Sequence, residues 1–280
     1  MRTFGLIGKT LTHSFSKTFF ENKFAKEAIV GVEYQLFELN VITDFEFLLA
    51  TQPNLVGLNV TIPYKQTIIP FLDELSTAAQ AIGAVNCVQI TKSKKIGHNT
   101  DAFGFEYSLN AHLPLTSIAG NYCVFVFGTG GSSKAVQYIL QQHNINFMLV
   151  SREAKIGSSI AYSQVAEHLG ERNLYINCTP LGMYPNVETC PQIDYTKVTK
   201  GDVFYDLVYN PEETLLLQHA KQKGAVTING LPMLHLQAEE SWRIWNKGWK
   251  IPFCCIGVIN TVQLTIVYYF FKLHQIAPAL

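Results

Sequence analysis

The chain has 280 residues, which is enough for two domains of ordinary size. Apolar residues make up 48% of it and charged residues 15%, so a large core is expected and extended disorder is not. Basic and acidic residues balance at 21 each, which argues against a nucleic-acid surface and against a strongly acidic partner.

The first hundred or so residues alternate between short β-like runs and helix-length stretches. Strands are predicted at residues 3–7, 34–38 and 56–62, and helices at residues 16–27 and 43–51. Along 56–62 the side chains alternate, which places Asn59 and Thr61 on one face. The pattern favours an α/β fold with mainly parallel strands. Residues 1–8 are typical of a strand that runs into a glycine turn and not of a signal peptide.

A continuously apolar strand at residues 122–127 begins a second unit. A glycine turn and a helix to Gln142 follow it, and further strands are predicted at residues 147–151, 174–179, 203–207 and 225–229. Strand, glycine turn, helix and strand in this order form the first half of a dinucleotide-binding domain. We place that domain at residues 102–230 and a substrate-binding catalytic domain at residues 1–101. An amphipathic helix at residues 231–247 is expected to pack back on the catalytic domain.

The glycine turn carries the first motif with chemical meaning. Gly128, Gly130 and Gly131 let the backbone approach a pyrophosphate. Ser132 begins the helix whose N-terminus supplies N–H donors and a favourable dipole. The last position of the usual GxGxxG pattern is Ser133, so the match is partial. A merely tight connection is the alternative, but the strand–turn–helix context favours dinucleotide binding.

The end of the next strand indicates which dinucleotide binds. An NAD-binding protein usually has an acidic residue there, whereas this chain has Ser151 and Arg152. A guanidinium at this place can pair with a 2′-phosphate, and Lys155 can add a second positive charge. Glu153 points the other way, and a solvated surface arginine is the alternative interpretation. We predict NADP(H) as the cofactor.

Polar residues of the first unit supply the other half of the candidate site. Asn59 and Thr61 share a strand face, and Lys65 follows in the turn, where a lysine beside a carbonyl can act as general acid or base. Ser14 and Ser16 flank a helix start and can donate hydrogen bonds to a carboxylate. A surface lysine and a simple helix N-cap are the alternative interpretations.

The six cysteines and eight histidines show no spacing typical of a metal site, so we predict no bound metal. Cys123 and Cys178 lie in apolar runs. The cysteines are interpreted as small buried side chains in a reducing compartment, and we expect a cytoplasmic protein.

Taken together and in order, the motifs resemble the shikimate dehydrogenase family. The matching stretches span residues 4 to 247 and are Gly8 with residues 13–16, and residues 59–65, 83–86, 99–101, 128–132, 177–183, 205–211 and 230–238. Two positions depart from the family pattern. Lys17 replaces a usual proline, and Ala102 replaces a usual glycine. Neither change removes a chemical group that the reaction of this family needs.

The resemblance implies an N-terminal α/β substrate domain, a Rossmann-type NADP-binding domain, and NADPH-dependent reduction of 3-dehydroshikimate to shikimate in chorismate and aromatic amino-acid biosynthesis. It implies that Lys65 relays the proton at the reacting oxygen and that Asp101 holds substrate and lysine in place. The other substrate-binding residues that it implies are Ser14, Ser16, Asn59, Thr61, Asn86, Tyr209 and Gln237. The cofactor-binding residues that it implies are Gly128, Gly130, Gly131, Ser132, Ser151, Arg152, Lys155, Thr179, Met183, Leu207 and Gly230. The expected partner is the small-molecule substrate alone, with a monomer or homodimer as the assembly.

The last residues, 248–280, match nothing in the family and stay unassigned. Within them, residues 251–271 carry no charge and have the length of a membrane span. Polar residues and Pro252 interrupt this stretch, so we do not expect a span. An extra helix packed on the core and an end that is not native to the enzyme are the alternatives.

Three other functions stay open. A quinate/shikimate dehydrogenase that prefers NAD would favour an acidic residue in place of Ser151 and Arg152. A non-catalytic small-molecule-binding module on the same fold should have lost Lys65 or Asp101, yet both are present. A related dehydrogenase of folates or aminoacyl-tRNA fits the serine pair and the balanced charge poorly.

Overall fold

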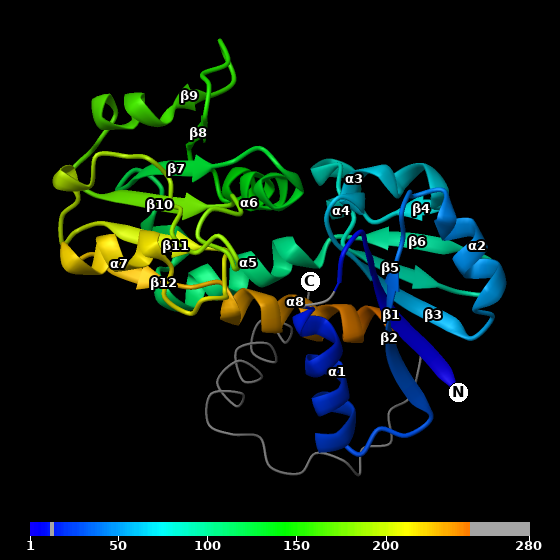
Figure 1. Cartoon of the computed structure of the whole chain (residues 1–280). Coiled ribbons are helices and arrows are strands. Elements are labelled where there is room, and N and C mark those ends of the chain that lie inside the picture. The colour runs from blue at the N-terminus through cyan, green and yellow to red at the C-terminus, as the bar shows by residue number, and fades with distance from the viewer. Residues whose placement is uncertain (12–13, 247–280) are drawn as a thin grey trace, which may run out of the picture.

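Two six-stranded sheets joined by two long helices make up the protein in a computed structural model, which describes residues 1–11 and 14–246 (Figure 1). A hydrophobic core lies on each face of each sheet. The α/β class and the division into two domains are thereby confirmed. The apolar tail predicted at residues 248–280 lies outside the described residues. None of the described helices combines the length and the apolar composition of a membrane span.

The first sheet is mixed. Its strands, in spatial order, are β2 (Val32–Glu38), β1 (Arg2–Gly8), β3 (Leu55–Val60), β5 (Cys87–Ile90), β6 (Lys95–His98) and β4 (Glu74–Leu75). β1 pairs in parallel with β2 and β3, but β5 runs antiparallel to both β3 and β6. The expectation of mainly parallel strands is therefore only partly right here, because β5 and β6 are joined as a hairpin without a helical crossover.

The strand predicted at residues 56–62 ends earlier than expected, at Val60. The backbone N–H of Thr61 still donates to the carbonyl of Ile7 (2.9 Å), but Ile62 is exposed and the chain then turns at Pro63, which has no N–H to donate. Lys65 consequently lies on a short helix that begins directly beyond the sheet edge.

Helices cover both faces of the first sheet. On one face lie α2 (Asp44–Thr51), α3 (Tyr64–Thr67), α4 (Thr77–Ile82) and the 3₁₀ helix η1 (Ile69–Phe71), and on the other lie α1 (Phe15–Lys26) and α8 (Leu231–Trp245). An aromatic cluster packs under α1 and α8, where the rings of Phe4 and Trp245 lie 5.1 Å apart. A side chain at Gly57 would come within 2.6 Å of the Trp245 ring, so glycine lets α8 approach the sheet. A helix from the end of the described chain thus completes the first domain.

The second sheet is entirely parallel. Its strands, in spatial order, are β12 (Val226–Ile228), β11 (Val203–Asp206), β10 (Asn173–Asn177), β7 (Cys123–Phe127), β8 (Met148–Ser151) and β9 (Ile160–Ala161). Counted from β7, this is the strand order 3-2-1-4-5-6 of a Rossmann fold. The order reverses between β7 and β10, and ligands of such sheets bind at the carboxyl ends of those strands. In Figure 1 the arrowheads of this sheet point toward the first domain.

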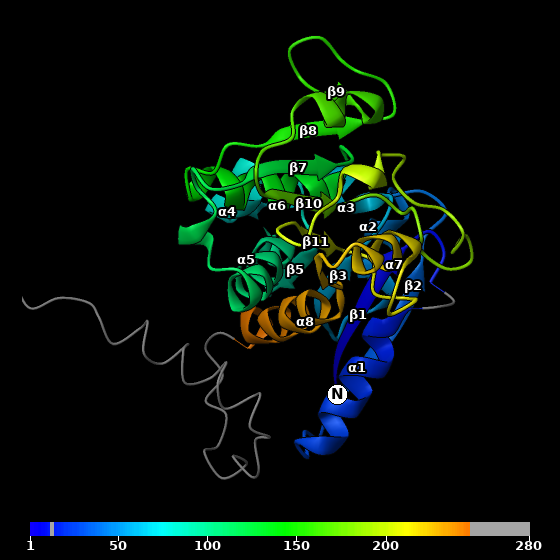
Figure 2. The ribbon, with the colours of Figure 1, turned by 90° about the vertical axis from the view of Figure 1, so that its left-hand side faces the viewer.

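The second domain contains the helices α6 (Gly131–Gln142) and α7 (Leu215–Gln222) and the 3₁₀ helices η2 (Leu115–Ser117), η3 (Tyr162–Glu167) and η4 (Tyr195–Lys197). α5 (Thr100–His112) connects the domains and packs beside α8, as Figure 2 shows. The two helices approach closely because Gly104 has no side chain: an added Cβ would lie 2.6 Å from the carbonyl oxygen of Met233. The proposed domain boundary at residues 101–102 falls in the first turn of α5.

The described cysteines are unpaired thiols. Cys87 and Cys190 are buried, as interpreted from the sequence. Cys123 and Cys178 are partly exposed, and Cys178 lies just beyond the end of β10 rather than inside a strand. Cys254 and Cys255 lie outside the described residues.

Candidate active site

Lys65 and Asp101 form an ion pair where the two domains meet. Lys65 lies on α3 and Asp101 in the first turn of α5, and the Lys65 Nζ and Asp101 Oδ2 atoms are 2.6 Å apart. The side chains are only 15% and 9% exposed. Asn99 caps α5 by accepting a hydrogen bond from the backbone N–H of Ala102 (3.2 Å), which fixes the turn that carries Asp101. The structure thus brings together the two residues that were expected to handle the proton.

Asn86 fixes the orientation of the Asp101 carboxylate. Its Oδ1 accepts a hydrogen bond from the backbone N–H of Thr100 (2.6 Å), so its amide nitrogen must face the other way. That nitrogen donates to Asp101 Oδ1 (2.8 Å), while Asp101 Oδ2 accepts from Lys65. Both carboxylate oxygens therefore act as acceptors, and the pair has one defined geometry.

A buried polar network continues from Asn86 to helix α8. Asn59 donates from Nδ2 to Ser241 Oγ (2.9 Å) and accepts from the hydroxyl of Tyr34 at Oδ1 (2.9 Å). The hydroxyls of Ser241 and Thr100 lie 3.1 Å apart, and Thr100 also bonds Asn86. All of these side chains are nearly or fully buried. The network links β3, α5 and α8 into one rigid wall of the candidate site.

Gln237 lies on the same face of α8 as Ser241. Its side chain is largely buried, donates from Nε2 to the carbonyl of Leu234 (2.9 Å), and accepts from the hydroxyl of Thr100 at 3.4 Å. Ser241 and Thr100 were not identified from the sequence. The spacing of four residues between Gln237 and Ser241 was the available signal, because it places both on one helix face.

The two serines at the start of α1 differ from a simple cap. Ser14 occupies the N-cap position without a side-chain capping bond. Its Oγ is buried and has no hydrogen-bond partner within the described residues. Ser16 lies in the first turn of α1, near Tyr34, whose pKa burial raises well above the ordinary value of a tyrosine. A buried hydroxyl without a partner is costly, so Ser14 is suited to a ligand group.

Thr61 and Tyr209 lie at the edges of this polar wall. Thr61 follows β3 directly and is partly buried. The ring of Tyr209, beyond the end of β11, meets the ring of Phe15 edge-on at 5.8 Å, and Phe15 contacts the ring of His235 at 5.1 Å. Residues of both domains therefore meet beside the serine pair.

The glycine turn has the geometry of a dinucleotide-binding turn. Gly128 adopts a φ of +96°, which favours glycine, and a Cβ there would lie 3.0 Å from Thr179. Gly130 stands at the N-cap of α6, with Gly131 and Ser132 in its first turn. Ser133, the mismatch in the sequence pattern, is fully buried and donates to the carbonyl of Gly128 (2.6 Å). It closes the turn and does not disrupt it.

Buried polar groups also shape the neighbouring loops of the second sheet. Asp206 accepts hydrogen bonds from Asn177 Nδ2 (2.9 Å), Thr214 Oγ1 (2.6 Å) and the N–H of Val208 (3.0 Å). Asn177 in turn accepts from the hydroxyl of Thr179 (2.6 Å). Burial raises the pKa of Asp206 to about 6. Asp206 and Asn177 were missed as site residues, although each is a polar residue at the end of an apolar parallel strand.

The remaining predicted cofactor residues lie around the same edge of the sheet. Gly230 begins α8 against β11, where a Cβ would overlap the carbonyl of Leu207 at 2.1 Å. Met183 is 41% exposed. Ser151 ends β8, and its hydroxyl bonds that of Ser159 (3.0 Å).

Arg152 and Lys155 lie on the projecting loop that follows β8, visible above the sheet in Figure 2. Both are exposed, as is Glu153 between them. Exposed cations of this kind are free to meet a phosphate.

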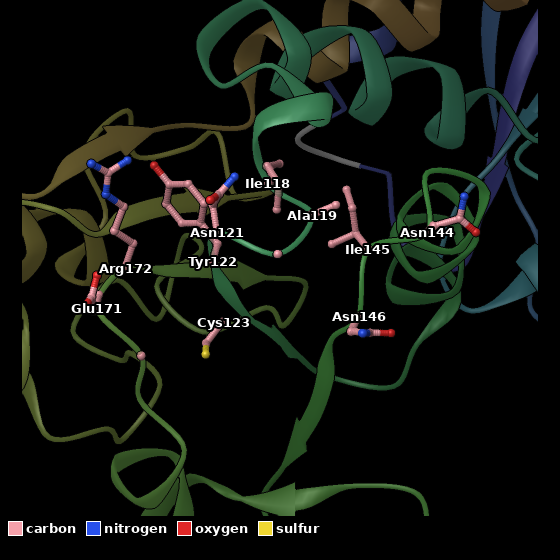
Figure 3. A pocket seen from close by; sticks show the side chains of 12 residues that line it. Ile118, Ala119, Asn121, Tyr122, Cys123, Asn144, Ile145, Asn146, Glu171 and Arg172 are labelled. Atoms are coloured by element: carbon pink, nitrogen blue, oxygen red, sulfur yellow. The ribbon is translucent and has the colours of Figure 1, made fainter.

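Two observations on the described residues limit the extent of the candidate site. No cluster of histidine, cysteine, aspartate and glutamate there is arranged to hold a metal ion. A cavity of about 580 Å³ opens at the amino ends of β7 and β10, lined by residues such as Asn121, Asn144 and Arg172 (Figure 3). It lies at the edge of the sheet opposite the glycine turn and takes no part in the candidate site.

Comparison with known proteins agrees with this geometry. Residues 6–88 match the family model of the shikimate dehydrogenase substrate binding domain. The shikimate dehydrogenase (NADP⁺) of Methanococcus aeolicus is 36% identical over 259 residues, which cover 86% of this chain and 90% of that protein. A crystal structure of shikimate dehydrogenase in complex with NADP⁺ superposes with a TM-score of 0.79 at 31% identity, covering 88% of this chain and 90% of that one. The crystal structure of shikimate 5-dehydrogenase from Thermus thermophilus in complex with NADP(H) and shikimate superposes with a TM-score of 0.76. The sequence identity is 28%, and the match covers 88% of this chain and 94% of that one. The chain belongs to the shikimate dehydrogenase family.

Proposed function

We propose that this protein catalyses the reversible, NADPH-dependent reduction of 3-dehydroshikimate to shikimate in aromatic amino-acid biosynthesis. The observation that carries the proposal is the Lys65–Asp101 ion pair of 2.6 Å at the meeting point of the two domains. Such a pair beside a dinucleotide turn supplies a proton where a hydride arrives. In this proposal residues 1–101 and 231–247 bind the substrate and residues 102–230 bind the cofactor.

The residues of the second domain fit NADP(H). The backbone N–H groups at the start of α6 face the crevice between β7 and β10, where a pyrophosphate would lie. Arg152 and Lys155 offer positive charge to a 2′-phosphate beside Ser151. Thr179, Met183, Leu207 and Gly230 would line the nicotinamide end. When bound, NADPH supplies the hydride.

The residues of the first domain fit a ring that carries hydroxyls and a carboxylate. Ser14 and Ser16 would hold the carboxylate, which would give the buried Ser14 hydroxyl its partner. Asn59, Thr61, Asn86, Asp101, Tyr209 and Gln237 would face the ring. Two of these side chains are held in place by bonds to neighbours, Asn59 by Ser241 and Tyr34 and Asn86 by Thr100.

In this proposal Lys65 transfers the proton, and Asp101 positions Lys65. The Lys65 ammonium donates a proton to the carbonyl oxygen as that oxygen gains negative charge, and the neutral amine takes a proton from the hydroxyl in the reverse direction. Asp101 holds Nζ in place and stabilises its positive charge. Asn86 holds Asp101, so the donor keeps its position through each turnover.

A spectrophotometric assay at 340 nm tests the proposal, with shikimate and quinate each offered with NADP⁺ and with NAD⁺. We expect shikimate with NADP⁺ to give the highest kcat/KM. A higher value for quinate with NAD⁺ would instead assign the quinate/shikimate dehydrogenase function. We further propose a monomer or homodimer in the cytoplasm, which gel filtration and cell fractionation test.

A further inference from the structure

Lys65 has a second partner, and that partner belongs to the dinucleotide turn. Its Nζ lies 2.6 Å from Asp101 Oδ2 and 3.3 Å from Ser132 Oγ, at the start of α6. A Cβ added to Gly131 would lie 3.5 Å from Cβ and Cδ of Lys65. The glycine turn therefore rests directly on the lysine side chain, and Figure 1 shows α3 and α6 facing each other.

The chemistry of the two groups fixes the direction of this bond. An ammonium group can only donate, so Ser132 Oγ is the acceptor of the bond from Lys65. The serine keeps its own hydrogen for donation to another group. One side chain thus joins the ammonium of the first domain to a turn built for phosphate groups.

The neighbouring serine shows what a purely structural role would look like. Ser133 is fully buried, donates to the carbonyl of Gly128 (2.6 Å), and accepts from Gln137 Nε2 (3.0 Å). These bonds stay inside the second domain and close the turn. Ser132 instead bonds across the domain boundary, to the residue proposed to transfer the proton.

We propose that Ser132 is a positioning residue that couples occupancy of the dinucleotide turn to the orientation of Lys65. The inference rests on the proposed function and deepens it. Asp101 and Ser132 together hold the Lys65 Nζ atom between the domains. The proton donor is therefore aligned when the first domain and the dinucleotide turn are both in place. When Ser132 donates its hydrogen to an anion at the turn, its oxygen becomes a better acceptor for Lys65.

A second contact between the same helices supplies a matched control. Lys134 Nζ on α6 donates to Gln66 Oε1 on α3 (3.1 Å), and this bond is exposed. Gln66→Ala removes a polar contact across the same boundary without touching the Lys65 ammonium. Ser132→Thr keeps the hydroxyl at the tested position.

The first test compares Ser132→Ala with wild type in kcat, in KM for shikimate, and in the Kd for NADPH measured by its fluorescence. We expect kcat to fall about tenfold, as for a lost hydrogen bond to a charged group. The Kd for NADPH should change less than about twofold, because the backbone N–H groups of the turn remain. Ser132→Thr should recover most of kcat, and Gln66→Ala should keep kcat within about twofold of wild type.

A second test does not depend on turnover. The rate at which an amine-reactive acylating reagent labels Lys65 is followed by mass spectrometry, with and without NADP⁺. We expect NADP⁺ to protect Lys65 several-fold more in wild type than in Ser132→Ala, whereas simple shielding by the cofactor would protect both equally.

Three results would overturn the role of Ser132. They are equal protection of Lys65 by NADP⁺ in wild type and in Ser132→Ala, an unchanged kcat in Ser132→Ala, and a loss of activity that weaker NADPH binding explains. A wild-type protein that leaves shikimate unoxidised would overturn the proposed function instead, and the labelling comparison would still decide the coupling.

Discussion

The two halves of the candidate site are built in opposite ways. On the substrate side, Asn59, Asn86, Asp101 and Gln237 are at most 9% exposed, and their polar atoms bond one another or α8. On the cofactor side, Gly130, Arg152 and Lys155 are exposed, and the turn offers backbone N–H groups. Apart from the buried hydroxyl of Ser14, the first half is a finished network before any ligand arrives, and the other half is an open surface.

The chemistry of the two ligands explains the difference. Neutral ring hydroxyls are recognised by direction, so their partners must be held in place by neighbours that are themselves fixed. A dinucleotide carries phosphate charge, which a helix N-terminus and long flexible cations attract without exact placement. The contrast predicts that changes on the substrate side affect kcat and stability, while changes to the exposed groups of the cofactor side affect cofactor affinity and preference. Ser132 belongs with the substrate side in this respect, because it bonds Lys65 across the boundary.

The largest expected effect comes from Lys65→Ala. Removal of the proposed proton donor should lower kcat by about 10²- to 10⁴-fold with little change in KM for shikimate. Steady-state kinetics measures this, and Lys17→Ala on the exposed face of α1 serves as the control. Turnover close to that of wild type in Lys65→Ala would remove the lysine from the mechanism.

Asp206 is the exception to the contrast, because it is a buried carboxyl group on the cofactor side. Burial raises its pKa from the ordinary 3.8 to about 6. Between these values the folded protein holds a proton that the unfolded chain releases, so the free energy of unfolding falls as pH rises from about 4 to about 6. The expected loss is up to about 3 kcal/mol.

Asp206→Asn should remove that slope and preserve the local geometry. The amide oxygen can accept from Asn177 and Val208, and the amide nitrogen can donate to Thr214 Oγ1. Denaturant unfolding of both proteins at several pH values gives the difference directly. Parallel stability curves for wild type and variant would show that Asp206 does not titrate in this range.

The sequence was most informative where structure is set locally. The apolar run that became β7, the glycine turn, and the alternation that placed Asn59 are all short-range signals, and each led to the right element. α5 was not predicted, because residues such as Phe105, Ser108 and Leu109 are buried around the helix and leave no clear amphipathic period. The antiparallel β5 and β6 were missed as well, since four-residue strands carry little pattern.

The site was predicted through motifs, and its connections were not. The motifs single out Lys65 and Asp101 as the proposed proton-handling pair, but nothing in the spacing of the chain places Ser241 beside Thr100 or Lys65 beside Ser132. Those contacts depend on how α8 crosses α5 and how α6 meets α3. They are products of tertiary packing.

Ser241→Ala tests the substrate side as a connected network. The change leaves Asn59 Nδ2 and the hydroxyl of Thr100 each short of a buried partner, which should cost about 2 kcal/mol of stability and lower kcat severalfold. Ser108→Ala is the matched control: Ser108 is equally buried on α5 and bonds the hydroxyl of Tyr205 (2.9 Å), outside the network. Both variants should lose stability in thermal unfolding, but only Ser241→Ala should lose kcat. An equal kcat in the two would mean that the network shapes the fold without shaping the chemistry.

Arg152→Ala tests the open side and should have the smallest effect on kcat and on stability. Loss of the guanidinium would remove the proposed charge-assisted contact to the 2′-phosphate, so kcat/KM for NADPH should fall about tenfold while that for NADH stays nearly constant. Parallel assays with the two cofactors measure this ratio, and thermal unfolding should be unchanged because Arg152 is exposed. A loss of kcat with both cofactors would contradict the contrast, since it would show that the projecting loop helps to organise the reacting groups. An unchanged ratio of kcat/KM for NADPH to that for NADH would mean that Lys155 and the hydroxyl of Ser151 recognise the 2′-phosphate. The same comparison with Lys155→Ala would then test this.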